Sequence, residues 1–183
     1  MQYVLFFRGL NVGGKHRVKM TELAALLTEL GFAHVQTYIQ SGNAVLDAQL
    51  PEGELCRKVA QAFLLRFGFA STVVARSAEA LRTVAEAMPF SGTDIAAAKA
   101  AEPDTEHLYL YFLPEPPTAQ ALALLAASDV GGDRVVVGER VVYLLCAGSV
   151  RTSPGAVRLA KLFPDATARN GKTLDAMLAL LRP

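Results

Sequence analysis

The spacing of apolar residues in the first half of the chain predicts strands and helices in a defined order. Short runs rich in β-branched and aromatic residues indicate strands, and apolar residues three and four positions apart indicate helices. Leu23, Leu26, Leu27 and Leu30 form such a helical stripe, which Gly31 ends. Strands are predicted over 3–7, 35–39, 44–47 and 71–76, and helices over 20–30 and 51–67. The resulting β-α-β-β-α-β order is ferredoxin-like.

The second half predicts the same order of elements. Ser153 followed by Pro154 is typical of a helix start. After a helix over 78–88, strands are predicted over 107–113, 135–137, 141–145 and 166–169, and helices over 118–127, 153–163 and 173–181. No residue-level repeat accompanies this repeated order. We therefore predict an α+β protein of two ferredoxin-like (βαββαβ) subdomains with antiparallel sheets, over 1–90 and 107–183, with a linker over 91–106 and an extra C-terminal helix.

Composition and charge narrow the function classes. The 183 residues are 52% hydrophobic, which favours a packed core over disorder, and the formal net charge of +1 argues against a polyanion binder that relies on bulk charge. Two local segments are nevertheless basic. The segment 8–19 contains no acid, and 149–172 contains five basic residues against Asp165 alone. Solvated surface charge is the alternative interpretation of both segments.

Several chemistries find no support in the sequence. Cys56 and Cys146 form no CxxC motif, and His16, His34 and His107 have no metal-ligand spacing, so we predict neither a metal site nor a cofactor. No nucleophile and base, and no acid/base pair of carboxylates, stand at a recognisable spacing, so the reaction, if there is one, stays unassigned. No apolar run is long enough to span a membrane and no leader pattern is present, so we predict a cytoplasmic protein without a membrane partner.

The glycine-rich segment after the first strand is the main candidate site. Residues 9–15 fit the phosphate-loop pattern G-x-x-x-x-G-K, but His16 stands where that pattern needs Ser or Thr to hold magnesium. A nucleotide triphosphatase is therefore disfavoured, whereas an anion-binding loop and a tight β-to-α connection both remain open. In the first interpretation, charge, amide donors and orientation come from the following residues: Arg8, Asn11, Gly13, Gly14, Lys15 and Arg17.

Two further segments carry candidate residues. Ser41 and Asn43 lie in a polar turn, which we expect at the sheet end opposite the glycine-rich loop, and turn chemistry explains them equally well. Arg169 and Asn170 precede the last helix, where a basic residue at a helix N-terminus can bind an anion. An ordinary helix start with solvated charge is the alternative there.

Three classes of function follow. The first is binding of a small anion, a nucleotide or a phosphorylated metabolite through the loop from Arg8 to Lys15. The second is a nucleic-acid-binding module, although the predicted strand over 44–47 lacks the aromatic residues that stack RNA bases. The third is a structural or partner-binding protein without catalysis. The sequence leaves the oligomeric state open.

Several motifs together resemble a known family. They are 7–15 (FRGLNVGGK), Met20-x-Glu22-Leu23, Gly31-Phe32 and 37–43 (TYIQSGN), in this order, with weaker matches at Pro89-Phe90 and 167–170. This set resembles domain-of-unknown-function family 1697. The resemblance implies a bacterial cytosolic protein of two ferredoxin-like subdomains and no established activity. One departure is Gly171, which stands where the family usually has tryptophan.

Overall fold

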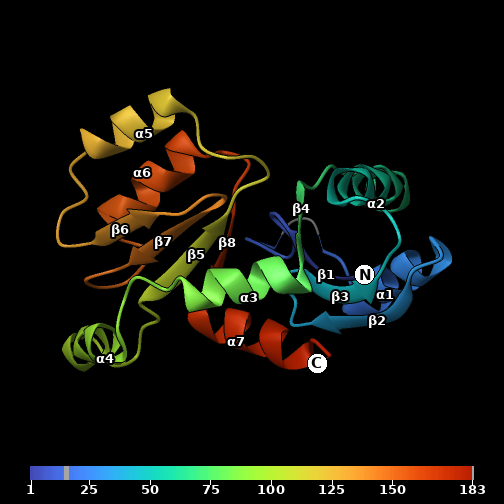
Figure 1. The fold of residues 1–183 in the computed structure, drawn as a ribbon, viewed down its shortest axis with the longest axis horizontal. Helices are drawn as coiled ribbons and strands as arrows, with labels where there is room; N and C mark the ends of the chain where they lie inside the picture. The colour runs from blue at the N-terminus through green and yellow to red at the C-terminus, as the bar shows by residue number, and fades with distance from the viewer. Residues whose placement is uncertain (15–16, 183) are drawn as a thin grey trace. The chain divides into compact units, whose positions relative to one another are not determined.

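A computed structural model describes residues 1–14 and 17–182 of the chain. Within these residues the chain forms two compact units. The first consists of residues 1–85 and the chain from Thr173 onward, and the second spans Glu86–Lys172 (Figure 1). Each unit contains one four-stranded antiparallel sheet in the part of the chain described. The bounds of independently folding domains remain a prediction.

The first unit has the predicted βαββαβ order. Strand β1 (Gln2–Phe7) leads to helix α1 (Met20–Glu29), strands β2 (Ala33–Tyr38) and β3 (Asn43–Asp47), helix α2 (Glu52–Phe67) and strand β4 (Val73–Ser77). The strand order is β2-β3-β1-β4, and β1 pairs antiparallel with both β3 and β4. Helix α3 (Ala78–Glu86) follows β4 directly.

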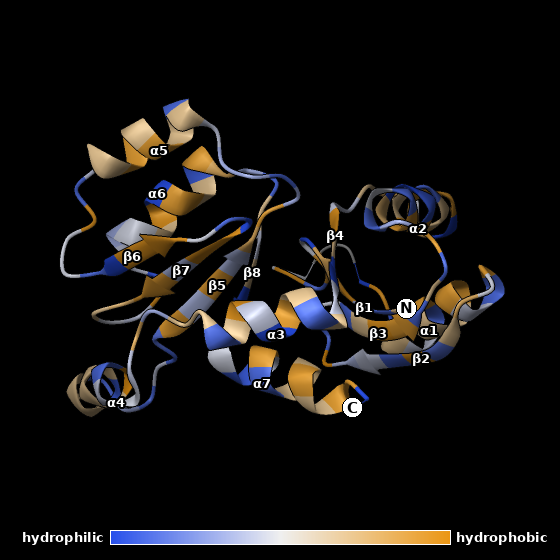
Figure 2. Cartoon of the chain, in the orientation of Figure 1, coloured by the Kyte–Doolittle hydropathy of each residue, from blue (hydrophilic) through white to orange (hydrophobic). Residues whose placement is uncertain are grey.

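The core of the first unit explains why β1 is apolar at every position from Tyr3 to Phe7. Tyr3, Leu5 and Phe7 pack in one cluster with the buried residues of α1 and α2. Among these, the Phe63 ring lies 5.4 Å from that of Phe7. Val4 and Phe6 point to the other face, and they are buried as well. A strand buried on both faces reads as a continuous apolar run. Figure 2 shows that the inner strands β3 and β7 are also mainly hydrophobic.

The second unit repeats this topology and confirms the predicted fold class. Its elements are α4 (Gly92–Ala101), β5 (Leu108–Phe112), α5 (Ala119–Ala126), β6 (Arg134–Val137), β7 (Val141–Leu145), α6 (Pro154–Leu162) and β8 (Thr167–Asn170). The order β6-β7-β5-β8 matches that of the first sheet position by position. Tyr111, Val142, Leu144 and Leu159 are at the centre of its core. The predicted C-terminal helix is α7 (Gly171–Leu180).

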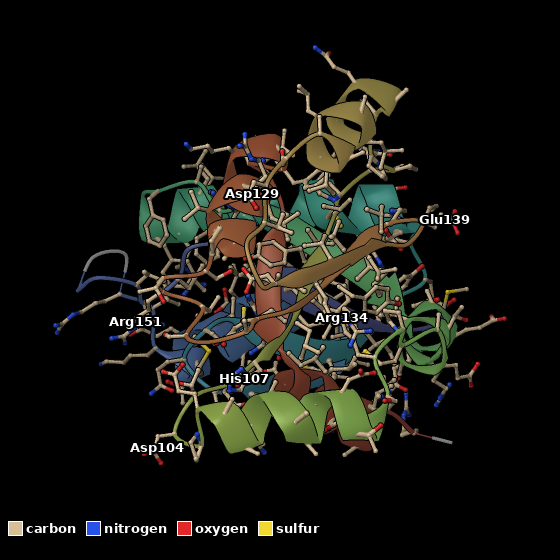
Figure 3. The ribbon with its side chains drawn as sticks, turned by 90° about the vertical axis from the view of Figure 1, so that its left-hand side faces the viewer. Asp104, His107, Asp129, Arg134, Glu139 and Arg151 are labelled. Carbon is tan, nitrogen blue, oxygen red and sulfur yellow. The ribbon has the colours of Figure 1, made fainter. Side chains whose placement is uncertain are left out.

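Helix α4 lies inside the segment predicted as a linker and is held by polar contacts. None of its residues, all of which the structure describes, is buried. Ser91 and Asp94 form a capping box at its start, and the Asp94 carboxylate accepts a hydrogen bond from Arg134 of β6. Arg134 is labelled in Figure 3. Its guanidinium lies 5.0 Å from the centre of the Phe90 ring. Helix α4 therefore depends on these side chains more than on apolar packing.

Strand register reveals a residue-level repeat that the sequence analysis missed. Arg76 lies opposite Val4 of β1, and Arg169 lies opposite Leu110 of β5. Both arginines are buried, and each donates from Nη1 to the carbonyl of the preceding alanine, at 2.6 and 2.8 Å. In each half the run Ala-Arg-Ser or Ala-Arg-Asn leads straight into a helix, with a buried leucine five residues after the arginine. The two units thus share one buried-arginine strand ending.

Gly42 should tolerate no side chain, because its backbone is left-handed and neighbouring atoms leave no room for a Cβ. Its φ is +79°, and an added Cβ would lie 2.8 Å from Leu10 Cδ2 and 2.9 Å from Phe7 Cβ. We expect Gly42→Ala to lower the free energy of unfolding by about 2 to 4 kcal/mol. Gly68→Ala is the matched control, because φ is +76° there but an added Cβ would meet no described atom within 4 Å. That control should cost only about 1 kcal/mol. Equal losses in urea denaturation would contradict the close approach at Gly42.

The attachment of α4 should weaken in acid. Hydrogen bonds from Ser91 and Arg134 lower the pKa of Asp94 from 3.8 to about 2. A carboxylate with a lowered folded-state pKa contributes stability above its unfolded pKa and loses it as pH falls toward the folded value. Asp94→Ala should therefore lower Tm at about pH 6, and the difference from wild type should narrow toward about pH 3. Asp104→Ala, at an exposed acid of the same unit, should change Tm little at either pH. A pH-independent Tm difference for Asp94→Ala would refute this.

Candidate functional site

The β1–α1 loop and the β2–β3 hairpin lie at the same end of the first sheet. The prediction that they lie at opposite ends was wrong. Strand β3 runs antiparallel to both β1 and β2. Strands β1 and β2 therefore run parallel to each other and end on the same side of the sheet. The Phe7 N–H donates to the Gly42 carbonyl at 2.9 Å, which fixes the start of the loop against the hairpin.

Asn11 closes the loop onto the hairpin with its side-chain amide. Its Nδ2 donates to the carbonyls of Val18 at 3.0 Å and Gln40 at 2.7 Å. Its Oδ1 accepts a hydrogen bond from the Val18 N–H at 2.9 Å. These bonds use both amide hydrogens and one acceptor position. Asn11 therefore positions the loop, and its role in orienting a ligand stays a prediction.

Gly13 and Gly14 serve the backbone conformation of the loop. Gly13 and Gly14 have φ of +61° and +75°, and an added Cβ at either would meet no described atom within 4 Å. Described atoms therefore leave room for a side chain there, and the left-handed backbone accounts for the residue type. The backbone of Arg8 is anchored, since its N–H donates to the Thr72 carbonyl and its own carbonyl accepts from Ser71 Oγ. The Arg8 side chain is exposed. Lys15 lies outside the described residues.

A depression opens between the loop, the start of α1 and the hairpin. Its volume is about 610 Å³. The described residues that line it are Asn11, Gly14, Arg17, Val18, Lys19, Glu22 and Gln40. Lys19 Nζ lies 3.9 Å from Glu22 Oε1, whereas no described residue forms an ion pair with the exposed Arg17. The described lining is thus net positive. The sequence analysis does not name Lys19 or Gln40 as site residues. Gln40 can be placed beside the loop only once β1 and β2 are known to end on the same side of the sheet.

Ser41 and Asn43 take structural roles in the hairpin. Asn43 is fully buried, and its Nδ2 donates to the Tyr38 carbonyl at 2.9 Å and to Ser41 Oγ at 3.0 Å. These bonds hold the turn, which agrees with the turn-chemistry alternative. Neither residue lines the depression.

Arg169 and Asn170 belong to the second unit, at the end of β8. Arg169 is buried, which lowers its pKa to about 10, and its Nη1 donates to Thr167 Oγ1 and the Ala168 carbonyl, both at 2.8 Å. Asn170 pairs with Tyr109 of β5. At Gly171 an added Cβ would lie 3.0 Å from Leu108 Cδ2. A tryptophan there would require Leu108 to move, so the departure at Gly171 is matched by its surroundings.

Other reactive groups are structural or isolated. Burial raises the pKa of the Cys146 thiol to about 11, so that thiol is protonated at neutral pH. His107 is buried and both ring nitrogens face carbonyl oxygens, of Cys146 at 2.9 Å and Glu102 at 3.0 Å. Among residues 1–14 and 17–182, no cluster of three or more His, Cys, Asp or Glu could hold a metal ion. Within the same residues, no helix combines the length and apolar content needed to cross a bilayer.

Comparison with protein families identifies the chain. The family profile described as "Protein of unknown function (DUF1697)" matches residues 1–143. The chain belongs to the DUF1697 family. Among solved structures, the conserved bacterial protein SP0830 from Streptococcus pneumoniae matches with a TM-score of 0.77 at 24% identity, over 99% of this chain and 98% of that one. At this identity the match shows a shared fold. No curated protein matches the chain.

Removing the Asn11 amide should loosen the loop that gives this DUF1697 protein its depression. Asn11 has φ of +57°, a conformation that glycine adopts without strain. Asn11→Gly therefore deletes the side-chain hydrogen bonds without straining the backbone. We expect a loss of about 1 to 3 kcal/mol in the free energy of unfolding, from three hydrogen bonds. The Val18 amide should also exchange faster with deuterium. Unchanged stability and unchanged amide exchange would mean that the hydrogen bonds of the Asn11 side chain do not stabilise the loop.

Proposed function

We propose that this DUF1697 protein binds a small phosphate-bearing metabolite in the depression beside the glycine-rich loop. The observation that carries the proposal is the lining itself, since Gly14, Arg17 and Lys19 are among the described residues that line a space of about 610 Å³. Small-molecule sites have volumes of about 300 to 1,000 Å³. The space therefore suits a ligand of nucleotide or sugar-phosphate size.

The chemistry of the lining supports an anionic group. Arg17 offers a guanidinium, which matches phosphate oxygens with two parallel donors. Lys19 adds a second cation and directly precedes α1, whose N-terminal end carries partial positive charge. Gly13 and Gly14 have left-handed backbones with no described atom within 4 Å of an added Cβ, and backbone N–H groups in such turns are suited to bind anions. Arg8, anchored at the base of the loop, adds long-range attraction.

The predicted roles change in one respect. Asn11, Ser41 and Asn43 hold the loop and hairpin, so we assign them to positioning. In this proposal the ligand contacts Arg17, which the sequence analysis already names, and Lys19, which it does not. The third class of function, a structural or partner-binding protein, also expects polar residues of the motif to serve the fold, as these three do.

Charge removal at the depression should weaken phosphate binding. We expect Arg17→Ala/Lys19→Ala to weaken the binding of a nucleoside monophosphate or a sugar phosphate about tenfold or more, as measured by calorimetry on the full chain. The matched control is Arg151→Ala/Lys161→Ala, which removes the same charge from exposed positions of the second unit. It should leave affinity within about twofold, because neither residue lines the depression.

Two outcomes would refute the proposal. One is the absence of binding by any phosphate compound to the folded wild type. The other is equal weakening by both double variants, which would indicate bulk charge. A short single-stranded oligonucleotide serves as a further probe, because a nucleic-acid site would show a steep salt dependence, with a slope of roughly −0.7 per phosphate contact.

A further inference from the structure

A second cavity lies in the second unit, where β5 ends and β8 begins. Its volume is about 220 Å³. One wall is the β5–α5 connection over residues 113–118, and the other is the α6–β8 connection over residues 162–166. For scale, a dry cavity of about 150 Å³ holds a benzene molecule. This cavity therefore has room for one ring-sized apolar group.

The walls are apolar and conformationally restricted. Pro114, Pro116 and Pro117 occupy one wall and Pro164 the other. Proline fixes φ and removes a backbone donor, so these walls offer few N–H groups to a ligand. The Arg140 side chain donates to the Pro114 carbonyl at 2.6 Å, which ties the first wall to the β6–β7 hairpin. A cavity with preset walls binds with little loss of loop entropy.

The only formal charges on the described lining are negative. Glu115 stands on one connection and Asp165 on the other, and both are exposed. Neither carboxylate has a hydrogen bond or ion pair with any described residue, and no described lining residue is basic. The N-terminus of α5 and the C-terminus of α6 also reach the cavity, and their partial charges have opposite signs. The two carboxylates are therefore the only formal charges on the described lining itself, with the Arg140 guanidinium bonded to the carbonyl of Pro114 in the first wall.

We propose that this cavity binds a small organic cation that consists of an ammonium group on a ring-sized apolar body. The ring would fill the space between the prolines and Phe163, and the ammonium would lie between Glu115 and Asp165. The proposal is independent of the anion site in the first unit. Its ligand has the opposite charge.

Three probes with the same ring and different charge test it on the full chain. Benzylammonium, benzyl alcohol and benzoate are titrated into isotopically labelled protein, and amide shifts are followed by NMR. We expect benzylammonium to bind about fivefold or more tightly than benzyl alcohol, with shifts at residues 113–121 and 162–166, and benzoate to bind least. Glu115→Gln/Asp165→Asn should reduce the affinity for benzylammonium to that for benzyl alcohol.

The matched control is Asp104→Asn/Glu139→Gln, which removes two exposed acids of the same unit that do not line the cavity (Figure 3). It should leave benzylammonium binding unchanged. All four substitutions are at exposed positions, so each double variant is expected to fold. The proposal fails if none of the probes binds, if the three bind alike, if the shifts map elsewhere, or if both double variants weaken binding equally.

Discussion

Strand β3 lies between β1 and β2 and runs antiparallel to both, and this arrangement decides which loops meet. Because the two outer strands of this trio run in the same direction, the segment that leaves β1 and the turn that leaves β2 emerge side by side. The Phe7 and Asn11 hydrogen bonds then join them. The depression exists because these two connections are held together, and the close approach at Gly42 keeps the distance short.

The second unit uses the same topology for a surface of different character. Leu113 donates its N–H to the Arg140 carbonyl at 3.0 Å, as Phe7 does to Gly42 in the first unit. In the first unit the connection after β1 is glycine-rich and basic. In the second unit the connection after β5 is proline-rich and contains an acid. One framework thus carries two loops of opposite charge. The buried arginines Arg76 and Arg169 belong to this shared framework.

The order of elements could be predicted from the sequence because most strands here are uninterrupted apolar runs, and the helices carry regular stripes. Both signals are local. The placement of the hairpin required one further step, since the direction of β2 follows from the helical crossover that joins it to β1. The role of Asn11 depended on contacts with Val18 and Gln40, the second of which is 29 residues away. No pattern in the sequence marks such a contact. The arginine repeat became visible only when strand register aligned the two halves.

The loop motif and the hairpin contain two kinds of polar residue. Residues with every polar atom engaged, such as Asn11 and Asn43, account for the shape of the loop and hairpin. Residues with exposed charge, such as Arg17, have no comparable structural task among the described contacts. A glycine-rich basic loop therefore combines two functions that sequence alone does not distinguish. Its glycines and asparagines build a fixed concave surface, and its cations determine which ligands that surface attracts.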